Sequence, residues 1–300
     1  MPELLDRRLV VVTGKGGVGK TTVAAALGLG AARAGKRTIV CEVAEQERLP
    51  TLFGETPAGH EEHELAPGLF GISIDPERAK LEWLQYQLKS GALAGLLGHS
   101  RIFQYLTAAA PGLTELVTIG KVWELAQLQR KTAKASPYDL VIVDAPATGH
   151  GVAMLRAPRT FSDVARVGPI HRQAGIIDRF LSDPASTGVL TVALPEEMPV
   201  NETLDLGQRL REEMRMGIDR IVVNQVLPER FTSAEAARLE SVDGDSPAIR
   251  AALTEYRRAR VQRSQLRRLR RAADAPVATL PFLFAPAIGR EQIETLAAKL

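Results

Sequence analysis

The chain has 300 residues, of which 45% are hydrophobic, and its formal net charge is +3. This composition is typical of a soluble globular protein and argues against an intrinsically disordered one. No run of 18 apolar residues is present, so no transmembrane segment is expected, and the first residues lack the order of a signal peptide. The single cysteine, Cys41, excludes a disulfide or a thiolate cluster within one chain, and we expect a cytoplasmic protein. Because 38 basic residues are nearly balanced by 35 acidic ones, the charge does not require a nucleic-acid partner.

Short apolar, β-branched runs alternate with helical stretches along the chain. The expected strands are Leu9–Thr13, Arg37–Val43, Leu69–Ile74, Leu140–Asp144, Val189–Leu194, Ile221–Asn224 and Val277–Leu280. Runs that are apolar on both faces suit parallel strands covered by helices. The alternation therefore predicts an α/β fold with a doubly wound, mainly parallel sheet of about seven strands.

Two stretches interrupt this alternation. Residues 79–134 and 159–187 hold helical patterns without a strand, and we expect both to form a helical subdomain inserted in a single domain that spans residues 1–300. The leucines and aromatic residues between Leu81 and Leu106 would form its core, with an exposed client surface as the alternative. Residues 57–68 have the composition of an exposed acidic loop, in which His60 and His63 are expected to be solvated rather than to bind a metal.

A glycine-rich loop follows the first expected strand and opens a helix from Thr22 to Ala34. Its sequence matches the phosphate-binding pattern GxxxxGK[ST]. Backbone N–H groups of such a loop, together with the helix N-terminus, surround phosphate oxygens. We expect Lys20 to neutralise the β- and γ-phosphates of ATP and the Thr21 hydroxyl to bind Mg²⁺. The expected nucleotide-binding residues here are Gly14, Gly16, Gly17, Val18, Gly19, Lys20, Thr21 and Thr22.

A second chemical signal is the acidic end of the strand Leu140–Asp144. Four apolar residues place Asp144 at the carboxyl end of a strand, beside the first βα turn, and ligands bind at that edge of such sheets. We expect Asp144 to act in catalysis by holding Mg²⁺ through water. The turn that follows would sense the γ-phosphate and move on hydrolysis.

Lys15 and the turn after Asp144 carry a family resemblance. The run Lys-Gly-Gly-Val-Gly-Lys-Thr resembles the deviant Walker A loop of the dimeric ATPases related to MinD, ParA and the arsenite-pump ATPase. Asp-x-x-x-Thr-Gly-His, followed by Met154–Pro158, looks like switch II of the ArsA-like family of arsenite-pump and tail-anchored-protein-targeting ATPases. Further similar runs are Ile74-Asp75-Pro76, Ala110-Pro111-Gly112-Leu113, Leu194-Pro195-Glu196 with Glu202-Thr203, Val223-Asn224-Gln225 and Leu280-Pro281. MinD and ParA lack the helical block and the Thr-Gly-His turn, so the ArsA-like branch is preferred.

The resemblance implies a P-loop ATPase that acts as a dimer, with an identical chain or with a paralogue. Lys15 would then reach the partner's nucleotide and act in catalysis, and Asn224 and Pro281 would flank the adenine. Glu42 stands where the family has an aspartate that orients the attacking water, so it is the third expected catalytic residue. The resemblance also implies a client, either a hydrophobic protein segment or a membrane-associated partner.

Two features leave alternatives open. Glu42 is one methylene longer than the family's aspartate, which leaves room for a nucleotide-gated regulatory or scaffold protein with little turnover. The arginine-rich stretch Arg257–Arg271 would suit a ParA- or MinD-like positioning ATPase on DNA. No aromatic residue interleaves with these arginines, so we do not expect a nucleic-acid partner. We expect the stretch to form a solvated face of a helix instead. Arsenite pumping is also not expected, because one cysteine cannot form a metalloid site.

Overall fold

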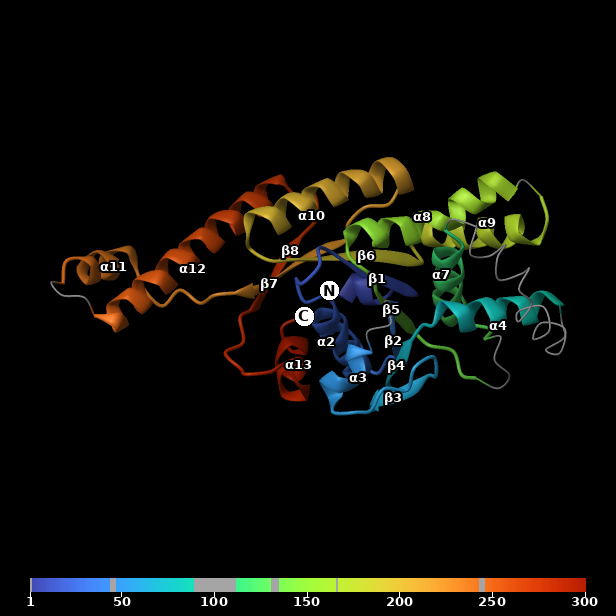
Figure 1. Cartoon of the computed structure of the whole chain (residues 1–300), viewed down its shortest axis with the longest axis horizontal. Helices are drawn as coiled ribbons and strands as arrows, with labels where there is room; N and C mark the ends of the chain where they lie inside the picture. The colour runs from blue at the N-terminus through green and yellow to red at the C-terminus, as the bar shows by residue number, and fades with distance from the viewer. Residues whose placement is uncertain (1, 44–46, 89–111, 131–134, 166, 243–245) are drawn as a thin grey trace.

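The computed structural model describes residues 2–43, 47–88, 112–130, 135–165, 167–242 and 246–300. Within them, one sheet crosses the molecule in the order β3-β4-β2-β5-β1-β6-β7-β8 (Figure 1). Its strands are β1 Leu9–Thr13, β2 Thr38–Glu42, β3 His63–Ala66, β4 Leu69–Ser73, β5 Leu140–Asp144, β6 Thr187–Ala193, β7 Arg220–Val226 and β8 Val277–Pro281. All neighbours are parallel except β3 and β4. The predicted α/β fold with a mainly parallel sheet is confirmed.

The prediction that residues 57–68 form a loop is wrong at their end, where β3 pairs antiparallel with β4. The strand covers four residues, and its first half is polar, so it lacks the apolar run that marks the other strands. Gly68 lies in the turn between the two strands with a φ of +77°, a conformation that glycine adopts readily. A short antiparallel edge strand is therefore added to the seven predicted ones.

Side chains of the central strands alternate between two cores, one on each face of the sheet. Val10, Val12 and Ile142 pack against α2 (Lys20–Arg33), α3 (Arg48–Phe53) and α13 (Arg290–Ala297). Val11 and Val143 pack on the opposite face against α7 (Leu113–Leu125), α8 (Thr148–Ala165) and α9 (Pro169–Ser182). This period-two alternation explains why every central strand is apolar throughout.

The two stretches predicted to be helical contain α7, α9, most of α4 (Pro76–Leu88) and the last seven residues of α8. The boundaries differ from the prediction, since α8 already begins at Thr148 and Thr187 already belongs to β6. Of the predicted subdomain core, Leu84 is buried. Most of the remaining candidates between Leu81 and Leu106 fall in residues 89–111, outside the described residues.

A helical arm leaves the body beside β7 and β8, at the left of Figure 1. It consists of α11 (Ser233–Glu240) and α12 (Pro247–Ala272), and α12 alone is about 39 Å long at 1.5 Å per residue. The buried residues of α12 are Ala259, near its middle, and Leu266 and Leu269 in its second half. Two of them pack with Val200 of α10 (Glu197–Arg209) and with β7. The second half of α12 thus anchors the arm.

None of the described helices combines the length and the apolar character that crossing a bilayer requires.

Candidate functional site

The glycine-rich loop joins β1 to α2 at the carboxyl edge of the sheet. Gly14, Gly17 and Gly19 all have positive φ, as a loop whose amides turn inward requires. A Cβ at Gly14 would lie 2.2 Å from the Val192 carbonyl oxygen of β6, and one at Gly19 would lie 2.5 Å from Asn224 Nδ2. The backbone of β6 therefore leaves room only for glycine at position 14, and the positive φ together with the Asn224 side chain favours glycine at position 19.

The two lysines of the loop point to different partners. Lys20 Nζ donates to the carbonyl oxygen of Lys15 at 3.1 Å, so its ammonium lies over the loop itself. Burial lowers the pKa of Lys20, although the nearby Asp144 charge opposes this shift. Lys15 Nζ instead pairs with Glu202 Oε1 on α10 at 2.5 Å, and 29% of its side chain is exposed. Lys15 is thus held outside its own phosphate cradle, while Lys20 remains within it.

Thr21 and Asp144 lie together, as the sequence predicts for a magnesium site. Thr21 Oγ1 donates to Asp144 Oδ2 at 2.5 Å. Asp144 Oδ1 is buried and has no hydrogen-bond partner among the described residues. Burial raises the pKa of Asp144 to about 6, against the effects of the Thr21 hydrogen bond and the Lys20 charge. A hydroxyl and a carboxylate with a free acceptor oxygen fit the hard cation Mg²⁺, directly or through water.

The turn after Asp144 carries a second unsatisfied oxygen. Thr148 begins α8, and its Oγ1 is buried without a hydrogen-bond partner in the described part of the chain. Buried polar atoms are nearly always paired in folded proteins, and exceptions point to a missing ligand or water. The predicted role of this turn as a γ-phosphate sensor stays a prediction.

Glu42 lies next to Asp144, its register partner on the adjacent strand, and is 3% exposed. Its Oε1 accepts hydrogen bonds from the backbone N–H groups of Arg48 (2.9 Å) and Leu49 (3.0 Å), at the start of α3. Burial raises the pKa of Glu42 to about 7, although these two bonds oppose the shift. The carboxylate therefore binds a helix start, a role that the sequence did not indicate, and its predicted role in orienting water stays a prediction.

Asn224 lies two residues before the end of β7 and Pro281 ends β8, on the far side of the loop from Asp144. Asn224 is 5% exposed, and its Nδ2 donates to the Val18 carbonyl oxygen at 3.0 Å. Pro281 is the last residue of β8 and is followed by Phe282, whose N–H donates to Val226 at 2.9 Å. The structure thus joins Asn224 to the phosphate loop and places Pro281 on the neighbouring strand end.

Two groups near this edge were not predicted as site residues. Glu202, the partner of Lys15, appeared in the sequence only as part of a family pattern. Phe284 is 61% exposed, meets Phe282 edge to face at 4.9 Å between ring centroids, and carries the Arg230 guanidinium 4.5 Å from its ring centroid. The sequence feature that could have indicated Phe284 is the run Pro-Phe-Leu-Phe at the end of the last strand. Lys20, Thr21 and Thr22 form the first turn of α2, and Gly16 and Val18 lie in the loop as predicted.

Comparisons with known proteins agree with this geometry. The chain matches the ArsA family model, described as anion-transporting ATPase, over residues 7–177 and 166–300. It is 32% identical over 252 residues to ATPase BagA of Mycobacterium tuberculosis, which covers 82% of this chain and 73% of that protein. It is 27% identical to a putative arsenical pump-driving ATPase of Halobacterium salinarum (75% of this chain, 36% of that protein). It is 24% identical to ATPase GET3C of Arabidopsis thaliana (76% and 69%). The chain therefore belongs to the ArsA family of anion-transporting ATPases, and it is an ATPase.

Proposed function

We propose that this ATPase works as a dimer, with an identical chain or a paralogue, in which Lys15 of each chain binds the triphosphate held by the other. The observation that carries the proposal is the separation of the two lysines, since Lys20 lies over its own loop and Lys15 pairs with Glu202. A partly exposed ion pair of this kind contributes about 1 kcal/mol or less. A highly charged triphosphate on a partner surface can therefore replace Glu202 as the counter-charge of Lys15.

Each chain would hold its own nucleotide and metal. The loop amides and Lys20 bind the phosphates, and Asn224 and Pro281 flank the base. Thr21 and Asp144 bind Mg²⁺ and its water, which fits the free Asp144 Oδ1. When bound, Mg²⁺ neutralises charge on the phosphate oxygens. Lys20 and the Lys15 of the partner chain then place two cations beside the transferring phosphoryl group, where negative charge must be stabilised.

The surroundings of Glu42 favour a second candidate, a nucleotide-gated binding protein with slow turnover. Its Oε1 is occupied by two amides of α3, so this oxygen is not free to accept a proton or a hydrogen bond from water. Glu42→Gln separates the candidates in a phosphate-release assay. If Glu42 orients water, the variant binds ATP but hydrolyses it at a greatly reduced rate. If Glu42 only holds α3, the variant keeps the slow wild-type rate.

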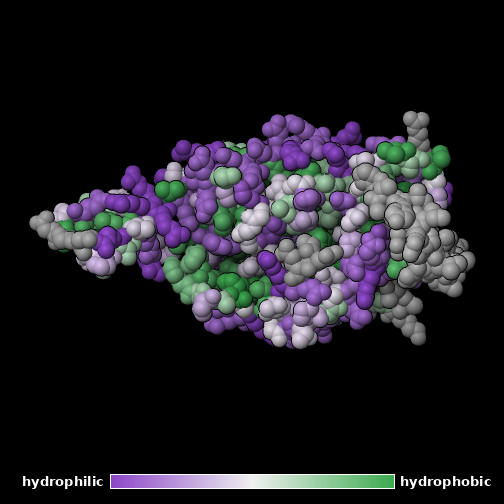
Figure 2. Space-filling view, in the orientation of Figure 1, coloured by the Kyte–Doolittle hydropathy of each residue, from purple (hydrophilic) through white to green (hydrophobic). Residues whose placement is uncertain are grey.

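The client of the proposed function would bind at the end of α8 and the start of α9. Large apolar side chains are exposed there: Val164 (76%), Val167 (80%), Ile170 (37%) and Ile176 (40%). Figure 2 shows hydrophobic atoms over this end of the molecule, at its upper right. Since α8 begins at Thr148, a shift of the γ-phosphate sensor would move the same helix that carries Val164. We therefore propose that ATP state controls binding of an apolar protein segment or a membrane-associated partner here.

Light scattering with a non-hydrolysable ATP analogue tests the dimer. Wild-type protein should double in mass when Mg²⁺ and the analogue are added, and Lys15→Ala should bind the analogue but dimerise far more weakly. A wild-type protein that stays monomeric at full nucleotide occupancy would refute the dimer of identical chains. The matched control is Lys80→Ala. Among the described residues, Lys80 forms an ion pair only with Glu77 of its own helix.

An apolar helical peptide tests the client surface. ATP-loaded wild type should bind it, and Val164→Glu/Val167→Glu should not. Val261→Glu, at an apolar position on α12 that is 59% exposed, should bind normally. Equal binding by all three proteins would place the client elsewhere.

A further inference from the structure

The part of α12 from Arg257 onward carries a concentration of positive charge that the proposed ATPase cycle does not use. Between Tyr256 and Ala273 the chain has no aspartate or glutamate, and it has eight arginines: Arg257, Arg258, Arg260, Arg263, Arg267, Arg268, Arg270 and Arg271. Leu266 and Leu269 bury the opposite side of the helix against α10 and β7. All of these arginines except the half-buried Arg263 are exposed.

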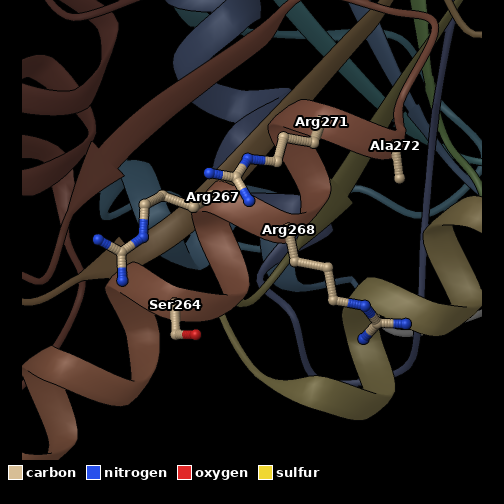
Figure 3. Close-up of a pocket in the computed structure, with 5 residues that line it drawn as sticks. All are labelled: Ser264, Arg267, Arg268, Arg271 and Ala272. Atoms are coloured by element: carbon tan, nitrogen blue, oxygen red, sulfur yellow. The ribbon is translucent and has the colours of Figure 1, made fainter.

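Part of this surface is hollowed. Ser264, Arg267, Arg268, Arg271 and Ala272 line a depression of about 500 Å³ at the foot of the arm (Figure 3). In this view the Arg267 and Arg271 side chains extend to the same side of α12, and Arg268 extends toward the other. The lining contains guanidinium groups and one hydroxyl but no carboxylate and no large apolar side chain.

Several arginines of the helix have their charge or donors taken up by neighbours. Arg257 pairs with Glu240 and Arg263 with Glu229, each at 3.1 Å. Arg268 Nη2 donates to Asn201 Oδ1 of α10 at 2.6 Å. Among the described residues, no carboxylate forms an ion pair with Arg267 or Arg271. The negative end of the helix dipole favours their charge but amounts to only about half an elementary charge.

The chemistry of the hollow selects its ligand class. Guanidinium groups bind phosphate oxygens in a paired, fork-like geometry, and the Ser264 hydroxyl supplies a further donor. A volume of this size suits a small ligand, and the absence of aromatic residues from Arg257 to Ala273 gives nucleic-acid bases nothing to stack on. We propose that this hollow binds the phosphoryl groups of a small anionic ligand, either a free oligophosphate or the headgroup of an anionic lipid.

The site also adjoins the catalytic machinery through α10. Asn201, which accepts from Arg268, precedes Glu202, which holds Lys15. Arg268, which lines the hollow, therefore bonds the residue next to Glu202, whose ion pair with Lys15 we propose to exchange during dimerisation. Binding does not depend on that exchange, so the two proposals fail separately.

The test measures binding with the nucleotide site already saturated with Mg-ADP, so that a phosphate probe does not occupy the P-loop. Inorganic pyrophosphate is titrated by calorimetry, and vesicles of phosphatidylcholine with phosphatidylglycerol are used in a sedimentation assay. Three proteins are compared: wild type, Arg267→Ala/Arg271→Ala, and the control Arg258→Ala/Arg270→Ala. The control removes the same charge from the same helix outside the hollow. Both variants place alanine at exposed helical positions, which favours the helix.

We expect wild type and the control to bind at least one probe with similar affinity, and the hollow variant to bind it about tenfold or more weakly. Binding of pyrophosphate identifies a free phosphate compound as the ligand. Binding of the vesicles without binding of pyrophosphate identifies a lipid headgroup. Equal losses in both variants would show only general attraction to a basic helix and would overturn the proposal. Failure of wild type to bind either probe, or tighter binding of a short DNA duplex than of both, would also overturn it.

Discussion

Two clusters of polar and charged groups lie at different places in the structure and differ in how their bonds are satisfied. At the carboxyl edge of the sheet, Asp144 Oδ1 and Thr148 Oγ1 are buried without partners among the described residues. Beside β3, α4 and α7, a second cluster is joined within itself, and we call it the charge network: Glu62, Glu82, Lys121, Glu124 and Arg130. The polar atoms of the first cluster need a ligand as their hydrogen-bond partner, whereas the charged groups of the second have partners within the chain.

The charge network is more deeply buried than its composition suggests. The side chains of Arg130, Glu124 and Lys121 are 1%, 7% and 9% exposed. Arg130 bonds Glu62 at 2.5 Å, and Tyr138 also donates to Glu62 at 2.7 Å. Because each charge has an opposite charge beside it, burial is tolerated. The comparison shows that burial of charge alone does not mark a site, whereas an unpaired buried oxygen beside a phosphate loop does.

The largest effect is expected at the unsatisfied cluster. Lys20→Ala should lower ATP turnover about a thousandfold, because it removes a cation placed at the transferring phosphoryl group. Its free energy of unfolding should stay close to wild type, since Lys20 bonds only a loop carbonyl in the described structure. Phosphate release and urea denaturation measure the two quantities. Turnover near the wild-type rate would mean that the loop does not bind phosphate.

The opposite pattern is expected in the charge network. Arg130→Met should lower the free energy of unfolding by about 3 kcal/mol, because it leaves the buried Glu124 and the partly exposed Glu62 without this partner. Turnover should be unchanged at temperatures where the variant is folded. Thermal unfolding and phosphate release on one preparation check both. A variant that keeps the full free energy of unfolding but loses turnover would contradict the structural role that we assign to the charge network.

A smaller, pH-dependent effect is expected at Glu82. Burial alone would raise its pKa, but hydrogen bonds from His60 and Lys121 outweigh burial and lower it to about 2. This pKa lies below the ordinary value of 4.5, so the stability that ionised Glu82 contributes is fully present above about pH 4.5 and is lost as pH falls towards 2. Glu82→Gln should therefore be less stable than wild type by about 1 kcal/mol at neutral pH, with the gap closing across this window. A gap that is constant down to pH 2 would exclude the charge as its cause.

The smallest effect on turnover is expected at Glu202. Glu202→Gln removes the counter-charge of Lys15 but leaves the phosphate cradle intact. Turnover should stay within a few fold of wild type or rise, because Lys15 becomes free for the partner's triphosphate. Steady-state phosphate release at saturating ATP measures this. A loss as large as that of Lys15→Ala would mean that Glu202 belongs to the reacting site itself.

The sequence predicted the features that arise from local patterns. Apolar runs located seven strands, and glycine spacing located the loop, because both follow from backbone geometry over a few residues. Asp144 was found for the same reason, at the end of a run of four apolar residues. The structure added contacts between residues far apart in the chain, such as Lys15 with Glu202 and Arg130 with Glu62. Such pairs depend on how helices pack on the sheet, which no local pattern records.

Two features were missed for different reasons. The sequence did not indicate that Glu42 bonds the start of α3, because that helix begins six residues later and its amides reach the carboxylate only in the folded chain. β3 is short and half polar, and it is held by its partner strand rather than by its own composition.

Mixing two inactive variants tests the central claim, that Lys15 serves the nucleotide of the partner chain. Lys15→Ala and Lys20→Ala chains are each assayed alone and then together at equal concentration with Mg-ATP. In a mixed dimer, the site of the Lys15→Ala chain keeps its own Lys20 and receives Lys15 from the other chain, so it is complete. The account predicts that the mixture recovers a clear fraction of wild-type turnover. A mixture no more active than the two variants measured separately would show that Lys15 does not act across a dimer.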